Sequence, residues 1–141
     1  MSRTTPLGHV MMVDDEQIDQ MMYRRIIDRS GMAEDVVGFT YAEEALAYLK
    51  EGDRPPVDLI LLDINMPRMT GFEFLEAACA ELGEAFNTSV VIMLTTSLNP
   101  RDKARAASFD MVRGYVNKPL EPENLRVAAE AVKEVAANRV A

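Results

Sequence analysis

The sequence feature that most constrains the fold is an apolar run at residues 57–62 that is interrupted once, by Asp58, and stops at Asp63. Four consecutive apolar residues, 59–62, are typical of a strand buried on both faces, as in a parallel sheet covered by helices. The run ends in a carboxylate and a turn that contains Pro67. Ligands bind at the carboxyl edge of open α/β sheets, so the pattern predicts that Asp63 is presented to a site.

The rest of the chain predicts a regular alternation of strands and helices. Further strands are expected at residues 9–13, 36–40, 89–94 and 112–116, and helices at residues 17–29, 42–51, 72–82, 99–108 and 122–138. Such an alternation implies parallel strands joined by right-handed crossovers. We therefore expect one α/β domain over residues 8–141, preceded by a flexible lead-in at residues 1–7.

Helical spacing predicts which side of the first and last helices is buried. In the first helix the apolar residues that recur at this spacing are Ile18, Met21, Met22 and Ile26. In the last helix they are Leu125, Ala128, Ala129, Val132, Val135 and Ala136. Val127 and Ala131 lie off that stripe and are a candidate dimer patch.

Composition excludes several classes of protein. A formal net charge of −8 argues against direct nucleic-acid binding, which needs clustered Lys and Arg. Cys79 is the single cysteine, so neither an intrachain disulfide nor a cysteine-rich metal site can form. No apolar stretch approaches the roughly 18–20 residues of a membrane span, and the first residues do not resemble a signal peptide. A cytoplasmic protein without membrane contact is the expectation.

Polar side chains follow four of the five predicted strands. If the strands are parallel, Asp14, Asp15, Asp63, Thr95 and Lys118 share one edge of the sheet. Close carboxylates repel one another unless a cation intervenes, and Mg²⁺ prefers such oxygen ligands. Lys118 can then meet phosphate oxygens, and Thr95 can offer a hydrogen bond. An Asp carboxylate can form an aspartyl phosphate, so these residues predict phosphoryl transfer to Asp63.

Each of these residues also has an ordinary structural interpretation. An Asp at a strand end is most often a helix cap or a turn residue. Thr95 can bond its own backbone, and Lys118 can be a solvated edge residue. The arrival of all five at the appropriate strand ends favours a site.

Four motifs resemble one known family. They are Val13-Asp14-Asp15-Glu16, Leu61-Leu62-Asp63-Ile64-Asn65-Met66-Pro67 with Thr70-Gly71, Leu94-Thr95-Thr96-Ser97, and Tyr115-Val116-Asn117-Lys118-Pro119. Their types and order resemble the receiver domain of two-component response regulators, over residues 9–138. The resemblance implies a flavodoxin-like (βα)5 three-layer sandwich with a parallel five-stranded sheet in the order 2-1-3-4-5.

The resemblance also implies a role for each site residue. Asp63 would accept a phosphoryl group from a phosphohistidine, and Lys118 would hold a phosphoryl oxygen beside a cis Lys118-Pro119 bond. Thr95 would be the switch hydroxyl, and Tyr115 the aromatic that turns inward. Mg²⁺ would be held by Asp14 (through water), Asp15, Asp63 and the backbone carbonyl of Asn65.

Partners follow from the same resemblance. No effector domain follows residue 141 in the sequence, so the chain resembles stand-alone receivers: chemotaxis-type regulators, phosphorelay intermediates and those paired with bacterial phytochrome kinases. The motif 94–97 and residues 108–110 lean towards the phytochrome-associated type. The phosphodonor would be a cognate sensor histidine kinase or phosphotransfer protein. A downstream protein would bind the face formed by the fourth helix, the fifth strand and the fifth helix.

The alternative from another class is a phosphatase of the haloacid dehalogenase type, which also uses an Asp nucleophile with Mg²⁺. Those enzymes carry Asp-x-Asp, whose second Asp is the acid and base. Here the stretch is Asp63-Ile64-Asn65, and the amide of Asn65 cannot act as an acid or a base. A degenerate receiver that only docks is disfavoured because no site residue is missing. A non-enzymatic phosphoacceptor, which turns over only its own Asp, is the preferred interpretation.

Overall fold

The computed structural model describes residues 5–140, with side chains through residue 137. Its strands are β1 (Gly8–Val13), β2 (Ala33–Phe39), β3 (Leu59–Leu62), β4 (Val90–Thr95) and β5 (Val112–Asn117). Its helices are α1 (Gln17–Ser30), α2 (Ala42–Leu49), α3 (Gly71–Leu82), α4 (Pro100–Ala107) and α5 (Pro122–Val140). A short 3₁₀ helix, η1 (Gly83–Thr88), was not expected from the sequence.

All five strands pair in parallel, in the order β2-β1-β3-β4-β5. The flavodoxin-like fold is therefore confirmed. The register aligns the strand ends: Val13 lies opposite Leu62 and Thr95 lies opposite Asn117. Residues that directly follow these strands are consequently placed at one edge of the sheet.

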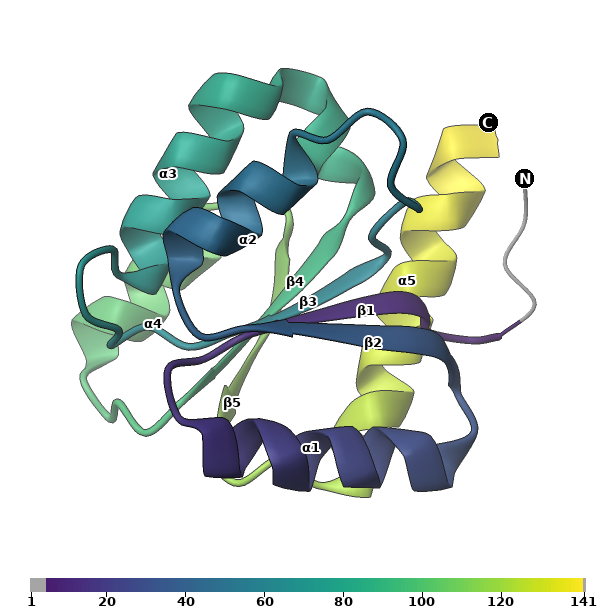
Figure 1. The fold of residues 1–141 in the computed structure, drawn as a ribbon, viewed down its shortest axis with the longest axis horizontal. Helices are drawn as coiled ribbons and strands as arrows, with labels where there is room; N and C mark the ends of the chain where they lie inside the picture. Colours follow the sequence, from purple (N-terminus) through teal and green to yellow (C-terminus); the bar gives the residue numbers. More distant parts are fainter. Residues whose placement is uncertain (1–4, 141) are drawn as a thin grey trace.

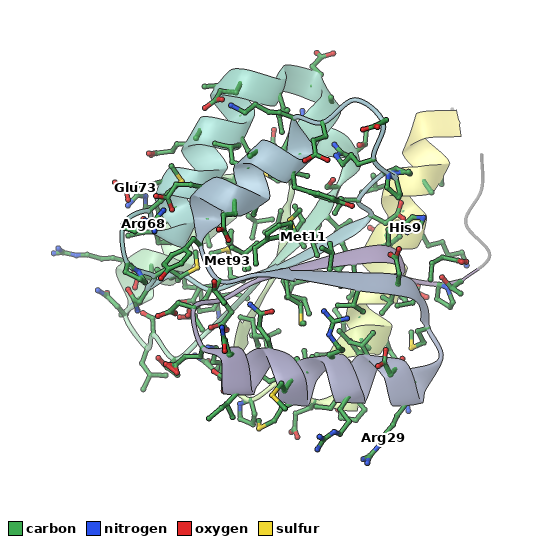
Figure 2. The ribbon with its side chains drawn as sticks, in the orientation of Figure 1. His9, Met11, Arg29, Arg68, Glu73 and Met93 are labelled. Carbon is green, nitrogen blue, oxygen red and sulfur yellow. The ribbon has the colours of Figure 1, made fainter. Side chains whose placement is uncertain are left out.

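Helices cover both faces of the sheet and form the outer two layers (Figure 1). One apolar cluster lies between the sheet and α2, α3 and α4, and it contains Met11 and Met93 (Figure 2). The second cluster lies against α1 and α5 and includes Val10, Met12 and Leu94. Strands β3 and β4 are buried along their whole length, as their unbroken apolar sequences predict. No described helix is long and apolar enough to cross a bilayer.

The prediction of which side of α1 is buried is wrong. Ile18, Met21 and Met22 are 72%, 62% and 42% exposed, whereas Tyr23 and Ile27 are buried. Ile26 is only partly buried at the edge of the core. The stripe that faces the sheet runs through Gln20, Tyr23 and Ile27. Because Gln20 and Tyr23 carry polar groups, the spacing of apolar residues alone does not identify this face.

Two smaller expectations also need correction. Leu7 is fully buried and its N–H donates to the Met32 carbonyl at 2.8 Å, so the last residue of the expected flexible lead-in is packed against the domain. Residues 1–4 lie outside the described part of the chain. Ala131 is only 9% exposed and belongs to the core against α5, so it cannot be part of a dimer patch. Val127 is exposed, as expected.

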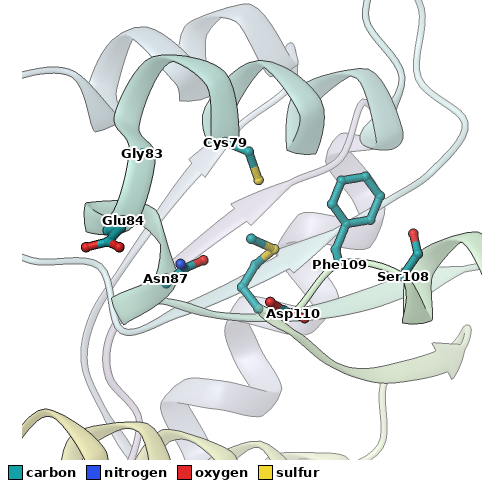
Figure 3. Close-up of a pocket in the computed structure, with 8 residues that line it drawn as sticks. Cys79, Gly83, Glu84, Asn87, Ser108, Phe109 and Asp110 are labelled. Atoms are coloured by element: carbon teal, nitrogen blue, oxygen red, sulfur yellow. The ribbon is translucent and has the colours of Figure 1, made fainter.

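A cavity of about 370 Å³ lies at the amino-terminal edge of the sheet, away from the ends of β1 and β3 (Figure 3). It is lined by the end of α3, by η1 and by the turn before β5, including Cys79 and Phe109. Cys79 is partly buried, and burial raises the pKa of its thiol. None of the residues assembled at the carboxyl edge lines this cavity.

Candidate functional site

The structure brings three carboxylates together where β1 and β3 end. Oxygen atoms of Asp14, Asp15 and Asp63 all lie within 4.8 Å of one another. Asp14 and Asp63 are buried, with 4% and 7% of their surface exposed, and Asp15 is half-buried. The parallel pairing of β1 with β3 accounts for this convergence, because the two strands end side by side.

The loop after β3 is fixed by the start of α3. The Ile64 N–H donates to Asp63 Oδ1 at 2.8 Å, and the Gly71 N–H donates to the Ile64 carbonyl at 2.8 Å. A Cβ at position 71 would collide with the Asp63 carbonyl oxygen, so only glycine permits this approach. Thr70 caps α3 and forms a capping box with Glu73, which fixes where the helix begins.

The turn after β1 is held by Gln20. Its Nε2 donates to the carbonyl oxygens of Asp14 at 2.7 Å and of Phe39 at 2.8 Å. The Glu16 N–H donates to Asp14 Oδ1 at 2.9 Å. These bonds tie the first turn of α1 to the ends of β1 and β2, and they orient the Asp14 carboxylate towards the cluster.

Lys118 enters the cluster from the end of β5. Its Nζ lies 2.8 Å from Asp14 Oδ2, 2.9 Å from Asp19 Oδ2 and 3.6 Å from Asp63 Oδ2. The Lys118 N–H donates to the Thr95 carbonyl at 2.9 Å, which places the two residues next to each other. The Lys118-Pro119 bond is cis. Sequence reasoning missed Asp19; its signal was an acid in the first turn of α1 that follows the Asp14-Asp15 pair.

The balance of charge at this edge is negative. Burial raises the pKa of Asp63, and the charges of Asp14 and Asp15 raise it further, against the opposing effect of Lys118. Burial likewise raises the pKa of Asp14. Burial alone would lower the pKa of Lys118, but its hydrogen bonds to Asp14 and Asp19 outweigh burial and raise the pKa. The site has the chemistry of one that gains from a further cation.

These pKa directions predict that ionised Asp63 destabilises the metal-free fold. Its folded pKa is above its unfolded value, so stability falls as the pH rises from about 4 through the folded pKa, and stays lower above it. Asp63→Asn keeps the hydrogen bond from Ile64 and removes the charge. At pH 7 in chelator it is expected to raise the melting temperature by a few degrees, since 1 kcal/mol corresponds to about 4 °C.

Thermal unfolding followed by circular dichroism between pH 4 and 7 measures this effect. Asp53→Asn, at an exposed loop position, is the matched control and is expected to leave the melting temperature unchanged. A melting temperature of Asp63→Asn at or below that of the wild type at pH 7 contradicts the prediction.

The remaining expected site residues lie beside the cluster. Thr95 is fully buried, and its Oγ1 accepts the Ser97 N–H at 3.2 Å. Tyr115 is half-buried, and its hydroxyl donates to the Ser97 carbonyl at 3.4 Å, so it contacts the loop before α4 rather than the carboxylates. Asn65 follows the buried Ile64 with an exposed side chain. Ser97 thus links Thr95 and Tyr115.

Comparisons with known proteins agree with this geometry. A family model described as the response regulator receiver domain matches residues 10–130. A response regulator of Cytophaga hutchinsonii, solved as a crystal structure, is 30% identical and superposes with a TM-score of 0.82, covering 91% of this chain and 98% of that one.

Two curated relatives differ greatly in length. The probable methanogenesis regulatory protein FilR2 of Methanothrix harundinacea is 30% identical, over 89% of this chain and 81% of that protein. The sensor histidine kinase CheAY of Helicobacter pylori is also 30% identical, over 88% of this chain but only 15% of that protein. The second match therefore covers a small part of a much longer protein.

Proposed function

Because the chain belongs to the response regulator receiver family of two-component systems, we propose that it signals by accepting a phosphoryl group on Asp63. The observation that carries this proposal is the position of Asp63, buried between two further carboxylates and within 3.6 Å of the Lys118 ammonium. A carboxylate in this setting is presented for reaction yet surrounded by groups that can neutralise a phosphate.

The acid cluster fits a hard divalent cation, and we assign it to Mg²⁺. Oxygen atoms from three carboxylates lie within 4.8 Å of one another, and burial raises the pKa values of Asp14 and Asp63, so their ionised forms gain from a neighbouring cation. Asp15 and Asp63 would hold the ion directly, Asp14 through water, and Asn65 through its backbone carbonyl. When bound, the ion would neutralise phosphate oxygens and carboxylate charge.

Asp63 would act as the nucleophile. Its Oδ1 accepts the Ile64 N–H, and its Oδ2 lies on the side of Lys118, 3.6 Å from the ammonium. The P–O bond to Asp63 forms as the P–N bond to the donor histidine breaks, and the imidazole leaves with the bonding electrons. Lys118 would meet one phosphoryl oxygen as a point charge, and the Thr95 hydroxyl would donate to another.

Phosphorylation would be communicated through the loop that precedes α4. To reach the phosphoryl group, the Thr95 hydroxyl gives up the Ser97 N–H, and Tyr115 is bonded to the same residue. A shift at Thr95 therefore changes the surroundings of Tyr115. The phosphorylated protein would favour the conformation in which these contacts are rearranged, as a shift between two pre-existing populations.

Receiver domains interact with histidine kinases or phosphotransfer proteins, and α1 offers a surface for such a donor. Ile18, Met21 and Met22 form an exposed apolar stripe at positions i, i+3 and i+4 of α1. Their spacing suits packing against another helix, and their turn of α1 adjoins the Asp14–Asp15 pair. We assign this stripe to contact with the phosphodonor.

The downstream partner would bind the face formed by α4, β5 and α5. Exposed Leu98 and Val127 and the half-buried edge strand β5 support this assignment. The same face is the candidate surface for a homodimer, centred on Val127 now that Ala131 is excluded. Neither contact involves residues of the acid cluster.

Phosphorylation by acetyl phosphate tests the function. With Mg²⁺ the protein is expected to gain one phosphoryl group per chain, with acetate as the leaving group, and chelator is expected to prevent the gain. Release of many phosphates per chain from a small phosphoester would instead indicate a phosphatase. The family model that matches residues 10–130 is a receiver domain, and Asn65 occupies the position where such a phosphatase carries its acid and base.

A further inference from the structure

The ammonium of Lys118 lies closer to two other acids than to the phosphoacceptor. Its Nζ is 2.8 Å from Asp14 and 2.9 Å from Asp19, but 3.6 Å from Asp63. The Lys118–Asp19 contact is a hydrogen bond across 99 positions of sequence, from β5 to the first turn of α1. Asp14 is a member of the acid cluster, whereas Asp19 has no place in the proposed transfer.

Both members of the Lys118–Asp19 pair are shielded from water. The side chains are 10% and 27% exposed, so their attraction is screened less than that of a surface pair. Asp14 and Asp19 already engage two of the three N–H donors of Lys118, so a phosphoryl oxygen on Asp63 would have to share the ammonium with both carboxylates. The contact with Asp19 therefore stabilises the unphosphorylated arrangement relative to the phosphorylated one.

We propose that Asp19 is a positioning residue that competes with the phosphoryl group for Lys118 and so weakens the phosphorylated state. This inference rests on the proposed function of Asp63. Removing the Asp19 carboxylate leaves Lys118 with Asp14 and Asp63 as its acidic partners, while the hydrogen bonds of Gln20 and Glu16 keep the adjoining turn in place. If Asp19 only held the structure together, its removal would instead weaken the binding of the phosphoryl group or of a mimic of it.

Binding of beryllofluoride, a stable mimic of the phosphoryl group, measures the competition by titration calorimetry at saturating Mg²⁺. Asp19→Asn is expected to bind about tenfold more tightly than the wild type, within the range of coupling between contacting charges. Asp19→Glu keeps an acid that can reach Lys118 and is expected to restore binding to within about twofold of the wild type.

Glu16→Gln is the matched control. It removes one negative charge from the same end of α1, at an exposed position next to the site. It is expected to change the affinity for beryllofluoride by less than about twofold. The effect of Asp19 is attributed to its close contact with Lys118, and not to the net charge at this end of α1. Asp19→Ser is a second variant without the carboxylate, and melting curves establish that each variant is folded.

The inference is overturned if Asp19→Asn and Asp19→Ser bind beryllofluoride no more tightly than the wild type, or if Glu16→Gln tightens binding as much as they do. The proposed function fails in a different way. In that case the wild type itself does not bind beryllofluoride with Mg²⁺, and the inference falls with it.

Discussion

Asp63→Asn is expected to reduce phosphorylation by acetyl phosphate to background, at least about 100-fold below the wild type. The introduced amide has the shape of the carboxylate and retains the bond from the Ile64 N–H, but it cannot form the acyl phosphate. Burial between the other acids makes Asp63 the carboxylate that the site presents. Intact mass measured after incubation with Mg²⁺ and acetyl phosphate gives the stoichiometry.

The control for this prediction is Asp53→Asn, which changes an exposed carboxylate in the α2–β3 loop. It is expected to be labelled like the wild type. Because Asp63→Asn should also melt at a higher temperature, loss of labelling cannot be ascribed to unfolding. Labelling of Asp63→Asn at more than half of the wild-type level would contradict Asp63 as the acceptor.

Lys118→Met is expected to have the second largest effect, on both stability and phosphorylation. The change removes the ammonium and leaves the carboxylates of Asp14 and Asp19 without their partner. Breaking a buried ion pair on one side costs about 3 kcal/mol, which corresponds to a fall of roughly 10 °C in melting temperature. The rate of phosphorylation should fall at least about tenfold, because one phosphoryl oxygen loses its counter-charge.

Melting curves in chelator and in Mg²⁺, with labelling rates from acetyl phosphate, test this variant. Mg²⁺ is expected to recover more stability in Lys118→Met than in the wild type, because the carboxylates there lack compensation. Lys133→Met, at an exposed position on α5, is the control and should behave like the wild type. A Lys118→Met protein as stable and as rapidly labelled as the wild type would show that Lys118 neither stabilises the acid cluster nor assists phosphorylation.

The strand positions and the acid cluster could be predicted from the sequence because the buried strands have unbroken apolar sequences. Residues 59–62 and 90–94 are continuously apolar because both faces of β3 and β4 are covered, and few other structures produce that pattern. Parallel pairing then places the residues after those strands at one edge. Asp14, Asp15 and Asp63 meet there because β1 pairs with β3.

Other features depend on tertiary contacts that apolar spacing does not reveal. The buried side of α1 includes Gln20, whose amide bonds two carbonyl oxygens, so a polar residue marks the inner face while Ile18 and Met21 are outside. Asp19 bonds Lys118 across 99 positions of sequence, and its place in the first turn of α1 marks an acid near the site but does not identify Lys118 as its partner. Leu7 is buried because its side chain packs into the core cluster against α1 and α5, while its N–H bonds Met32 beside β2.

Locating the phosphoryl group in the chain shows directly whether Asp63 is the residue that carries it. Borohydride reduces an aspartyl phosphate to the alcohol and releases phosphate, and peptide mass spectrometry then identifies the altered position. After treatment with acetyl phosphate and Mg²⁺, the wild type is expected to show homoserine at position 63 alone. Reduction at another carboxylate, or none at all in a protein that has gained the phosphoryl mass, would exclude Asp63 as the acceptor.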